Sequence, residues 1–187
     1  FIDGKWSLSL FRLKLGAFSE GWKLYENRYH RNLTTQVSQP PITEAPQYLG
    51  ENFIQDLAGR HLFICPEQGV GDEVMFASIL PELASLVRGD SKARITLACE
   101  PRLVELFKRS FDFISVVPSD PGNNYQLLSS DVDNWIFSGS LAKVFRHSIE
   151  DFYKHQPYLL ADKSLTDIWK ARFDGLKHKL NVGISWT

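Results

Sequence analysis

The feature that most constrains this chain is an alternation of short apolar runs and helical patterns that begins at His61. The run HLFIC is followed by a glycine-rich stretch and then by apolar residues at helical spacing from Val74 onward. ARITLAC repeats the apolar run, PRLVELFKRSF repeats the helical pattern, and FISVVP supplies a third run. Such alternation is typical of parallel strands joined by crossover helices. The sequence therefore predicts an α/β fold, a Rossmann-like parallel sheet with flanking helices.

Later segments extend this pattern toward the end of the chain. NWIF predicts another strand, SLAKVFRHSI a helix, the stretch near Leu165 to Leu176 a further helix, and NVGISW a terminal strand. Pro81 lies within the first crossover helix and removes one backbone hydrogen bond, so we expect a kink or a restart near Leu80. The only methionine is Met75, and we therefore expect the sequence to be a fragment of a longer protein.

The first 60 residues have a different character. Apolar positions between Trp6 and Tyr29 have helical spacing that Gly16 interrupts, which predicts a helical hairpin over residues 1–33. In this interpretation Gly16 ends the first helix, Ser19 caps the second, and Glu20 lies in its first turn. Residues 34–60 hold three prolines and no helical period, so they predict an extended connector. The main domain then covers residues 61–180, and residues 181–187 begin a second one.

Composition disfavours several classes of function. The 21 basic and 22 acidic residues give a formal charge of -1, which provides no broad positive field for nucleic acid or anionic lipid. No apolar run is long enough for a membrane helix and no signal segment opens the sequence, so we expect a soluble, cytoplasmic protein without a membrane span. Cys65 and Cys99 lie in strand-like runs, which favours buried reduced thiols, and no clustered partners indicate a metal site.

The glycine-rich stretch PEQGVGD follows the first predicted strand, where open parallel sheets bind ligands. A dinucleotide fingerprint requires a small residue where Val74 stands, and no Lys-Ser/Thr pair of a P-loop follows. A nicotinamide or methyl-donor enzyme is disfavoured further because only Glu100 offers an acid after the second strand. Asp72 fits a helix N-cap, and it also fits a general base that takes a proton from a bound hydroxyl; the two roles are compatible.

The segment EQGVGDEVMFASILPEL resembles one in bacterial tetratricopeptide-repeat (TPR) proteins whose C-terminal region is similar to heptosyltransferases of the two-lobed GT-B fold. LKLGAFSEGWKLYENRYHR looks like the last repeat before that region. FSGSLAKVFRHSIEDF and PYLLAD resemble later family segments, with Ala142 where proline is usual, and NVGISWT resembles the first strand of the second lobe. The resemblance implies that this chain is a TPR-like hairpin followed by the N-terminal lobe.

The resemblance also implies a reaction and a set of site residues. The family is expected to transfer sugar with inversion and without a metal, from a nucleotide-sugar co-substrate to a glycan, a lipid-linked sugar or a protein. Asp72 matches the proposed general base. Contacts to the sugar or to the donor phosphate are implied for two loops, although tight turns with positive φ at the glycines and helix capping at the serines are alternatives. These positions are Glu67, Gln68, Gly69 and Gly71 in the first loop, and Ser138, Gly139 and Ser140 in the second.

In the two-lobed fold the N-terminal lobe mainly holds the acceptor, so we expect this chain alone to lack most of the donor site and to be inactive. The alternative is a noncatalytic interaction module, in which the TPR-like hairpin binds a protein partner and the Rossmann-like domain is catalytically silent.

Overall fold

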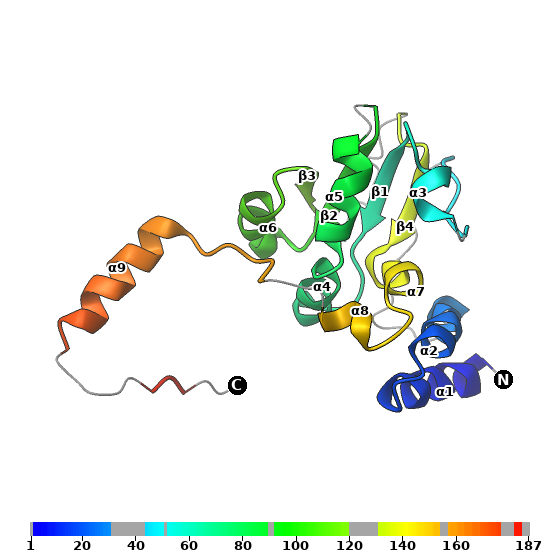
Figure 1. Cartoon of the computed structure of the whole chain (residues 1–187), viewed down its shortest axis with the longest axis horizontal. Coiled ribbons are helices and arrows are strands. Elements are labelled where there is room, and N and C mark those ends of the chain that lie inside the picture. The colour runs from blue at the N-terminus through cyan, green and yellow to red at the C-terminus, as the bar shows by residue number, and fades with distance from the viewer. Residues whose placement is uncertain are drawn as a thin grey trace.

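The computed structural model describes residues 2–30, 44–50, 52–89, 92–119, 131–153, 157–176 and 182–184. Its centre is a parallel sheet of four strands in the order β3-β2-β1-β4 (Figure 1). These strands are β1 (His61–Cys65), β2 (Arg94–Cys99), β3 (Ser115–Pro118) and β4 (Asn134–Phe137). The predicted α/β fold with a Rossmann-like parallel sheet is confirmed, and all four strands lie where the apolar runs predict them.

β1 and β4 are buried on both faces, which is why their sequences are nearly continuous apolar runs. Alternate residues of β1 enter two hydrophobic clusters, with Leu62 and Ile64 in the larger one and Phe63 and Cys65 in the smaller one. Cys99 belongs to the larger cluster, so the two cysteines face opposite sides of the sheet. Both are buried free thiols, as the sequence predicts.

Helices also contribute residues to the larger cluster. The first crossover contains α4 (Val70–Ala77) and α5 (Leu80–Gly89), which are separated at Ser78 and Ile79, so the predicted restart near Leu80 is confirmed. The second crossover begins with the 3-10 turn η2 (Pro101–Leu103) and continues as α6 (Val104–Ser110). After β4 come the 3-10 turn η3 (Ser138–Ser140), α7 (Leu141–Phe145) and α8 (Glu150–Tyr153).

The N-terminal hairpin consists of α1 (Ile2–Lys14), α2 (Phe18–Tyr25) and the 3-10 turn η1 (Glu26–His30). Gly16 has φ of +78°, a left-handed conformation that suits glycine and ends the first helix as predicted. The prediction that Ser19 caps the second helix is wrong. α2 begins at Phe18, the capping position belongs to Ala17, and no side chain caps it, so Ser19 already lies inside the helix.

The segment predicted as an extended connector contains a short helix, α3 (Phe53–Asp56). Phe53 and Leu57 are buried in the larger cluster, and this apolar burial outweighs the turn-forming composition around them. Upstream of α3 the chain is extended and adds to the sheet edge: the N–H of Tyr48 donates to the carbonyl of Trp135 at 2.7 Å. Residues 34–43 of the predicted connector lie outside the described part of the chain.

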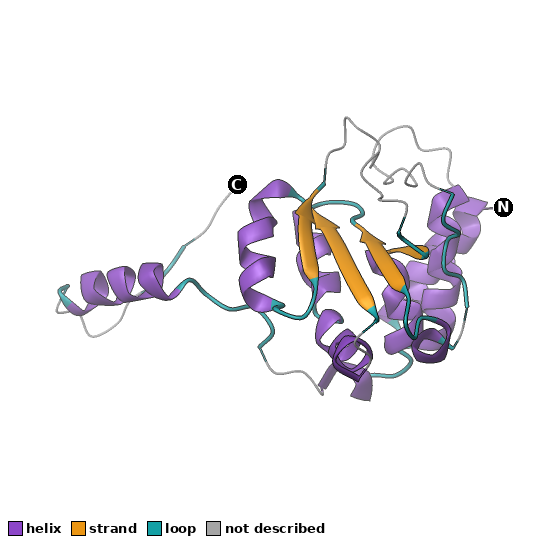
Figure 2. Ribbon diagram, turned by 90° about the horizontal axis from the view of Figure 1, so that it is seen from above, coloured by secondary structure: helices purple, strands orange, loops and turns teal. Residues whose placement is uncertain are grey.

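The last helix, α9 (Lys163–Asp174), extends away from the sheet and its covering helices (Figures 1 and 2). None of its residues is buried. The terminal strand is wrong for residues 182–184, which form no strand and are exposed; the rest of that segment is not described. Among the described helices, none has the length and apolar character that crossing a membrane requires.

Candidate functional site

The site lies at the carboxyl ends of β1 and β4, where the strand order reverses. From β1 the chain moves to β2 and β3 on one side, whereas β4 pairs with β1 on the other side. In open parallel sheets the loops that follow two such strands diverge and leave a crevice that binds ligands. Here these loops are residues 66–69 and η3, the two segments that the sequence singles out.

The first loop turns sharply at Gln68 rather than at a glycine. Gln68 has φ of 63°, the left-handed region that side chains rarely adopt, whereas Gly69 has φ of -111°. The prediction that the glycines provide positive φ is therefore wrong for Gly69, and Gly71 is already in the first turn of α4. A Cβ atom at Gly71 would meet no heavy atom within 4 Å, so packing does not require glycine there.

Asp72 lies in the first turn of α4, but it is not the N-cap that the sequence predicts. Gly69 occupies the capping position, and Asp72 is the third helical residue. Its Oδ2 accepts a weak hydrogen bond from the N–H of Gly69 at 3.3 Å, so the carboxylate helps to close the helix end from inside the helix. The side chain is half-buried in the turn that follows β1, and a partly exposed carboxylate can accept a proton from a bound hydroxyl.

Glu67 is engaged by the N-terminal hairpin. It is 2% exposed, and its two oxygens receive hydrogen bonds from Nε (2.8 Å) and Nη2 (2.7 Å) of Arg28, which is 3% exposed. Burial raises the pKa of the Glu67 carboxyl, and the Arg28 guanidinium opposes that shift. Gln68 also contacts the hairpin, because its Nε2 donates to the hydroxyl of Tyr25 at 2.5 Å. Both side chains are therefore committed to contacts within the chain.

The second loop packs tightly against the first. A Cβ atom at Gly139 would lie 2.5 Å from Oε1 of Glu67, so the two loops touch and no larger residue fits. Ser140 does not cap a helix with its side chain; its hydroxyl donates to Glu26 at 2.9 Å and accepts from Arg28 at 3.0 Å. Ser138 is buried, and its Oγ has no hydrogen-bond partner among the described residues. The structure thus brings all the predicted loop residues to one edge of the sheet.

Glu73 is a residue that the sequence analysis missed. It is 8% exposed, and its Oε2 accepts a hydrogen bond from the backbone N–H of Glu100 at 2.8 Å. Burial raises the pKa of this carboxyl to about 7, within the range of a proton-transfer group. An acidic residue beside Asp72 on the first turn looks like ordinary charge for a helix start, and only the approach of the β2 end shows that it is buried.

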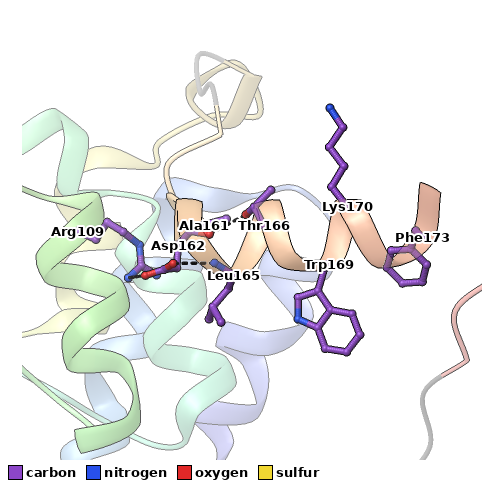
Figure 3. A pocket seen from close by; sticks show the side chains of 8 residues that line it. All are labelled: Arg109, Ala161, Asp162, Leu165, Thr166, Trp169, Lys170 and Phe173. Atoms are coloured by element: carbon purple, nitrogen blue, oxygen red, sulfur yellow. Dashed lines mark hydrogen bonds and ion pairs between the residues drawn. The ribbon is translucent and has the colours of Figure 1, made fainter. Parts of the chain in front are cut away.

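A concave surface lies away from the strand ends, between Arg109 of α6 and the start and side of α9 (Figure 3). It is an open groove of about 670 Å³, with Trp169 and Phe173 along one side and Lys170 on another. Arg109 closes its inner end by donating to the carbonyl of Leu160 at 2.8 Å. None of the predicted site residues lines this groove. Across the described ranges, no cluster of three or more His, Cys, Asp or Glu side chains could hold a metal ion.

One comparison with known proteins gives a clear match. Protein FlbA of Caulobacter vibrioides is 32% identical to this chain over 186 residues. The alignment covers 93% of this chain but only 29% of the relative, so the chain spans less than a third of that protein. No protein-family model matches the sequence, and no solved structure matches it.

Proposed function

We propose that this chain is the acceptor-side lobe of an inverting, metal-independent glycosyltransferase that uses a nucleotide-sugar donor. The support is the resemblance of its motifs to TPR proteins with a heptosyltransferase-like region, together with the position of the two loops at one edge of a Rossmann-like sheet. Partners in this proposal are the nucleotide sugar and a glycan, lipid-linked sugar or protein acceptor.

The observation that carries the proposal is the position of Asp72. Its half-buried carboxylate lies in the first turn of α4, at the corner after β1, and its only described hydrogen bond is the weak one to Gly69. In the proposed reaction the acceptor hydroxyl attacks the anomeric carbon of the donor and passes its proton to Asp72, while the bond to the nucleotide diphosphate breaks. A carboxylate at this position therefore has a direct role in the chemistry.

The structure narrows which loop residues could contact substrate in this proposal. Glu67 and Ser140 are already bonded to the hairpin, and Gln68 is bonded to Tyr25. The positions still available to a ligand are Gly71, which is exposed, the capping glycine Gly69, and Ser138, whose hydroxyl has no partner among the described residues. Small residues allow a sugar or phosphate to approach the main chain closely, and a buried hydroxyl without a partner gains from a ligand hydrogen bond.

The test is Asp72→Asn in a protein that carries both lobes, with transfer measured from a panel of nucleotide sugars. Loss of a general base lowers kcat by about 10²–10⁴-fold. Asp167→Asn is the matched control, because Asp167 is exposed on α9, away from the loops that follow β1 and β4. Transfer that is unchanged in Asp72→Asn, with a wild-type melting temperature, would contradict the proposed role.

A second candidate function is protein interaction through α9. Its apolar side chains Leu165, Ile168, Trp169 and Phe173 recur at helical spacing and are 46–61% exposed. Such a face is typical of a helix that inserts into a partner's groove. The two functions can be separated experimentally. Trp169→Glu should abolish the interaction and leave transfer unchanged, whereas Asp72→Asn should abolish transfer and leave the interaction unchanged.

A further inference from the structure

The hairpin contributes a buried cation between the loops that follow β1 and β4. Arg28 reaches the end of β1 from η1 and binds Glu67 with two parallel hydrogen bonds, 2.8 and 2.7 Å long. A carboxylate as buried as Glu67 is costly without a paired cation, and the bidentate arrangement fixes orientation as well as charge. This ion pair therefore joins the hairpin to the loop after β1. Removing either partner would leave the other as a buried, unpaired charge.

Two tyrosines of the hairpin hold the guanidinium in place. The Cζ atom of Arg28 lies 4.4 Å from the ring centre of Tyr25 and 4.0 Å from that of Tyr29. The ring of Tyr29 also stacks on Phe137, the last residue of β4, with centroids 4.6 Å apart. Because planar guanidinium stacks on aromatic faces, Arg28 has little freedom to leave Glu67.

The same tyrosines bond to both loops. The hydroxyl of Tyr29 lies 2.8 Å from the hydroxyl of Ser140 and donates to Glu67 at 3.2 Å. The hydroxyl of Tyr25 accepts from Gln68, the residue with left-handed backbone. A non-glycine residue in that conformation persists only when its surroundings hold it, and here the surroundings are side chains of the hairpin.

We propose that Arg28 is a positioning residue for this site: acting through Glu67, it sets the path of residues 67–69 and so the placement of the first turn of α4. In this view the hairpin is part of the candidate site rather than an independent repeat. The proposal deepens the function proposed above and rests on it only for the statement that Asp72 is the group being positioned. The effect of Arg28 on residues 67–69 and on the first turn of α4 can be measured without a substrate.

Hydrogen exchange at the start of α4 tests the proposal. The amides of Asp72 and Glu73 both donate to the carbonyl of Gly69 at 3.0 Å, so their protection reports the first turn directly. In Arg28→Met, which keeps the aliphatic stem, we expect these amides to exchange about tenfold faster or more, while amides of β1 change by about twofold or less. Glu67→Gln is expected to change the same amides in the same direction.

Arg146→Met is the matched control. Arg146 is 2% exposed, and it also binds a carboxylate, that of Glu82, at 2.7 Å. It lies at the end of α7, and its other described hydrogen bonds go to the carbonyls of Phe145 and Ser78 rather than to residues 67–72. Arg28→Lys gives a second reading, because lysine keeps the charge without the bidentate fork and should restore the protection only in part. This variant also serves if Arg28→Met fails to fold.

Three results would overturn the proposal: wild-type exchange at Asp72 and Glu73 in Arg28→Met, equally fast exchange in Arg146→Met, or full restoration by lysine. The first would mean that Arg28 only holds the hairpin, the second that any buried arginine has this effect, and the third that charge alone suffices. None of these depends on transfer activity, so a failure of the proposed function appears separately, in the Asp72→Asn experiment.

Discussion

The carboxylate of Glu73 accepts the backbone N–H of Glu100 at 2.8 Å and thereby links the corner after β1 to the corner after β2. Glu73 belongs to the first half of α4, and Glu100 directly follows β2 and precedes η2. The link is made by a side chain that is 8% exposed, so little water solvates the charged form. Burial is the largest cause of its raised pKa, and the hydrogen bond from Glu100 opposes it.

Folding stability should therefore depend on pH through Glu73. Its pKa is raised from 4.5 to about 7, so between these values the unfolded chain has lost the proton and the folded chain still holds it. The folded state binds more protons, and stability falls as pH rises across this window. Glu73→Gln keeps an acceptor for Glu100 and should flatten that slope, which melting temperatures from pH 4.5 to above 7 would measure.

Burial also raises the pKa of Glu67, which gives the stability of both wild type and Glu73→Gln a pH dependence of the same sign. The difference between wild type and Glu73→Gln is thus the quantity to compare. Glu105→Gln provides the control, because its side chain is 82% exposed and forms only a surface pair with Lys108. An identical slope in wild type and Glu73→Gln would contradict the assignment.

Gly139→Ala should destabilise the protein by about 1–3 kcal/mol, as overpacking of a closed site does. The new methyl group would meet Oε1 of Glu67 at 2.5 Å and Cζ of Phe76 at 3.0 Å, and Glu67 cannot move without breaking its bonds to Arg28. Gly71→Ala is the matched control: it has no neighbour within 4 Å and lies in a helix, where alanine is favoured by up to about 1 kcal/mol. Chemical denaturation measures both, and equal stability of the two variants would show that the loops do not touch.

The fold could be predicted from the sequence to the extent that local pattern determines it. Runs such as HLFIC and NWIF are continuous and apolar because their strands are buried on both faces, and this signal needs no knowledge of partners. Pro81 marked the break before α5 for an equally local reason. Phe53 gave no such signal: its helix is short and exists because its ring is buried in the larger cluster, which is a tertiary effect.

The candidate site, like the fold, could be predicted from the sequence only where local pattern determines it. Glycine and acid after a strand identified the corner at Asp72, and the family resemblance singled out residues 138–140. That the two loops meet at one edge follows from the strand order, which the sequence analysis did not predict. The role of Arg28 could not be predicted from the sequence, because its partner Glu67 is 39 residues away and nothing in the helical pattern of the hairpin marks Arg28 as buried. The sequence analysis placed the left-handed backbone at the glycines, because glycine adopts positive φ most readily. The structure has it at Gln68, where the contact with Tyr25 explains the exception.

Tyr158→Phe should lower the free energy of unfolding by about 0.5–1.5 kcal/mol, the usual net value of one hydrogen bond. The hydroxyl of Tyr158 donates to the carbonyl of Val74 at 2.9 Å, and its ring stacks on Phe111, so the substitution removes the bond and keeps the ring. Denaturant unfolding measures the loss. Tyr158→Leu removes both interactions and should be less stable than Tyr158→Phe, and a Phe variant as stable as wild type would show that the hydroxyl is not bonded in solution.

Removal of the Asp162 side chain should loosen the first turn of α9. Oδ1 of Asp162 accepts the N–H of Leu165 at 3.0 Å, an N-cap bond on a helix with no buried residue to hold it by packing. In Asp162→Ala we expect faster hydrogen exchange at Leu165 and Thr166, measured by NMR, and weaker helical circular dichroism. Asp167→Ala is the control, since it removes only the surface pair with Lys163 at 2.9 Å and leaves the cap.

The same cap predicts an acid response of α9. Hydrogen bonds from Ser164 and Leu165 lower the pKa of Asp162 below its ordinary value of 3.8, so the stabilising bond is present above that value. It is lost as pH falls through the lowered pKa, because protonation weakens the carboxylate as an acceptor. Wild-type α9 should therefore lose protection at Leu165 in acid, and Asp162→Ala should show no such loss because the titrating group is absent. Equal acid sensitivity in the two proteins would mean that another carboxylate controls the start of this helix.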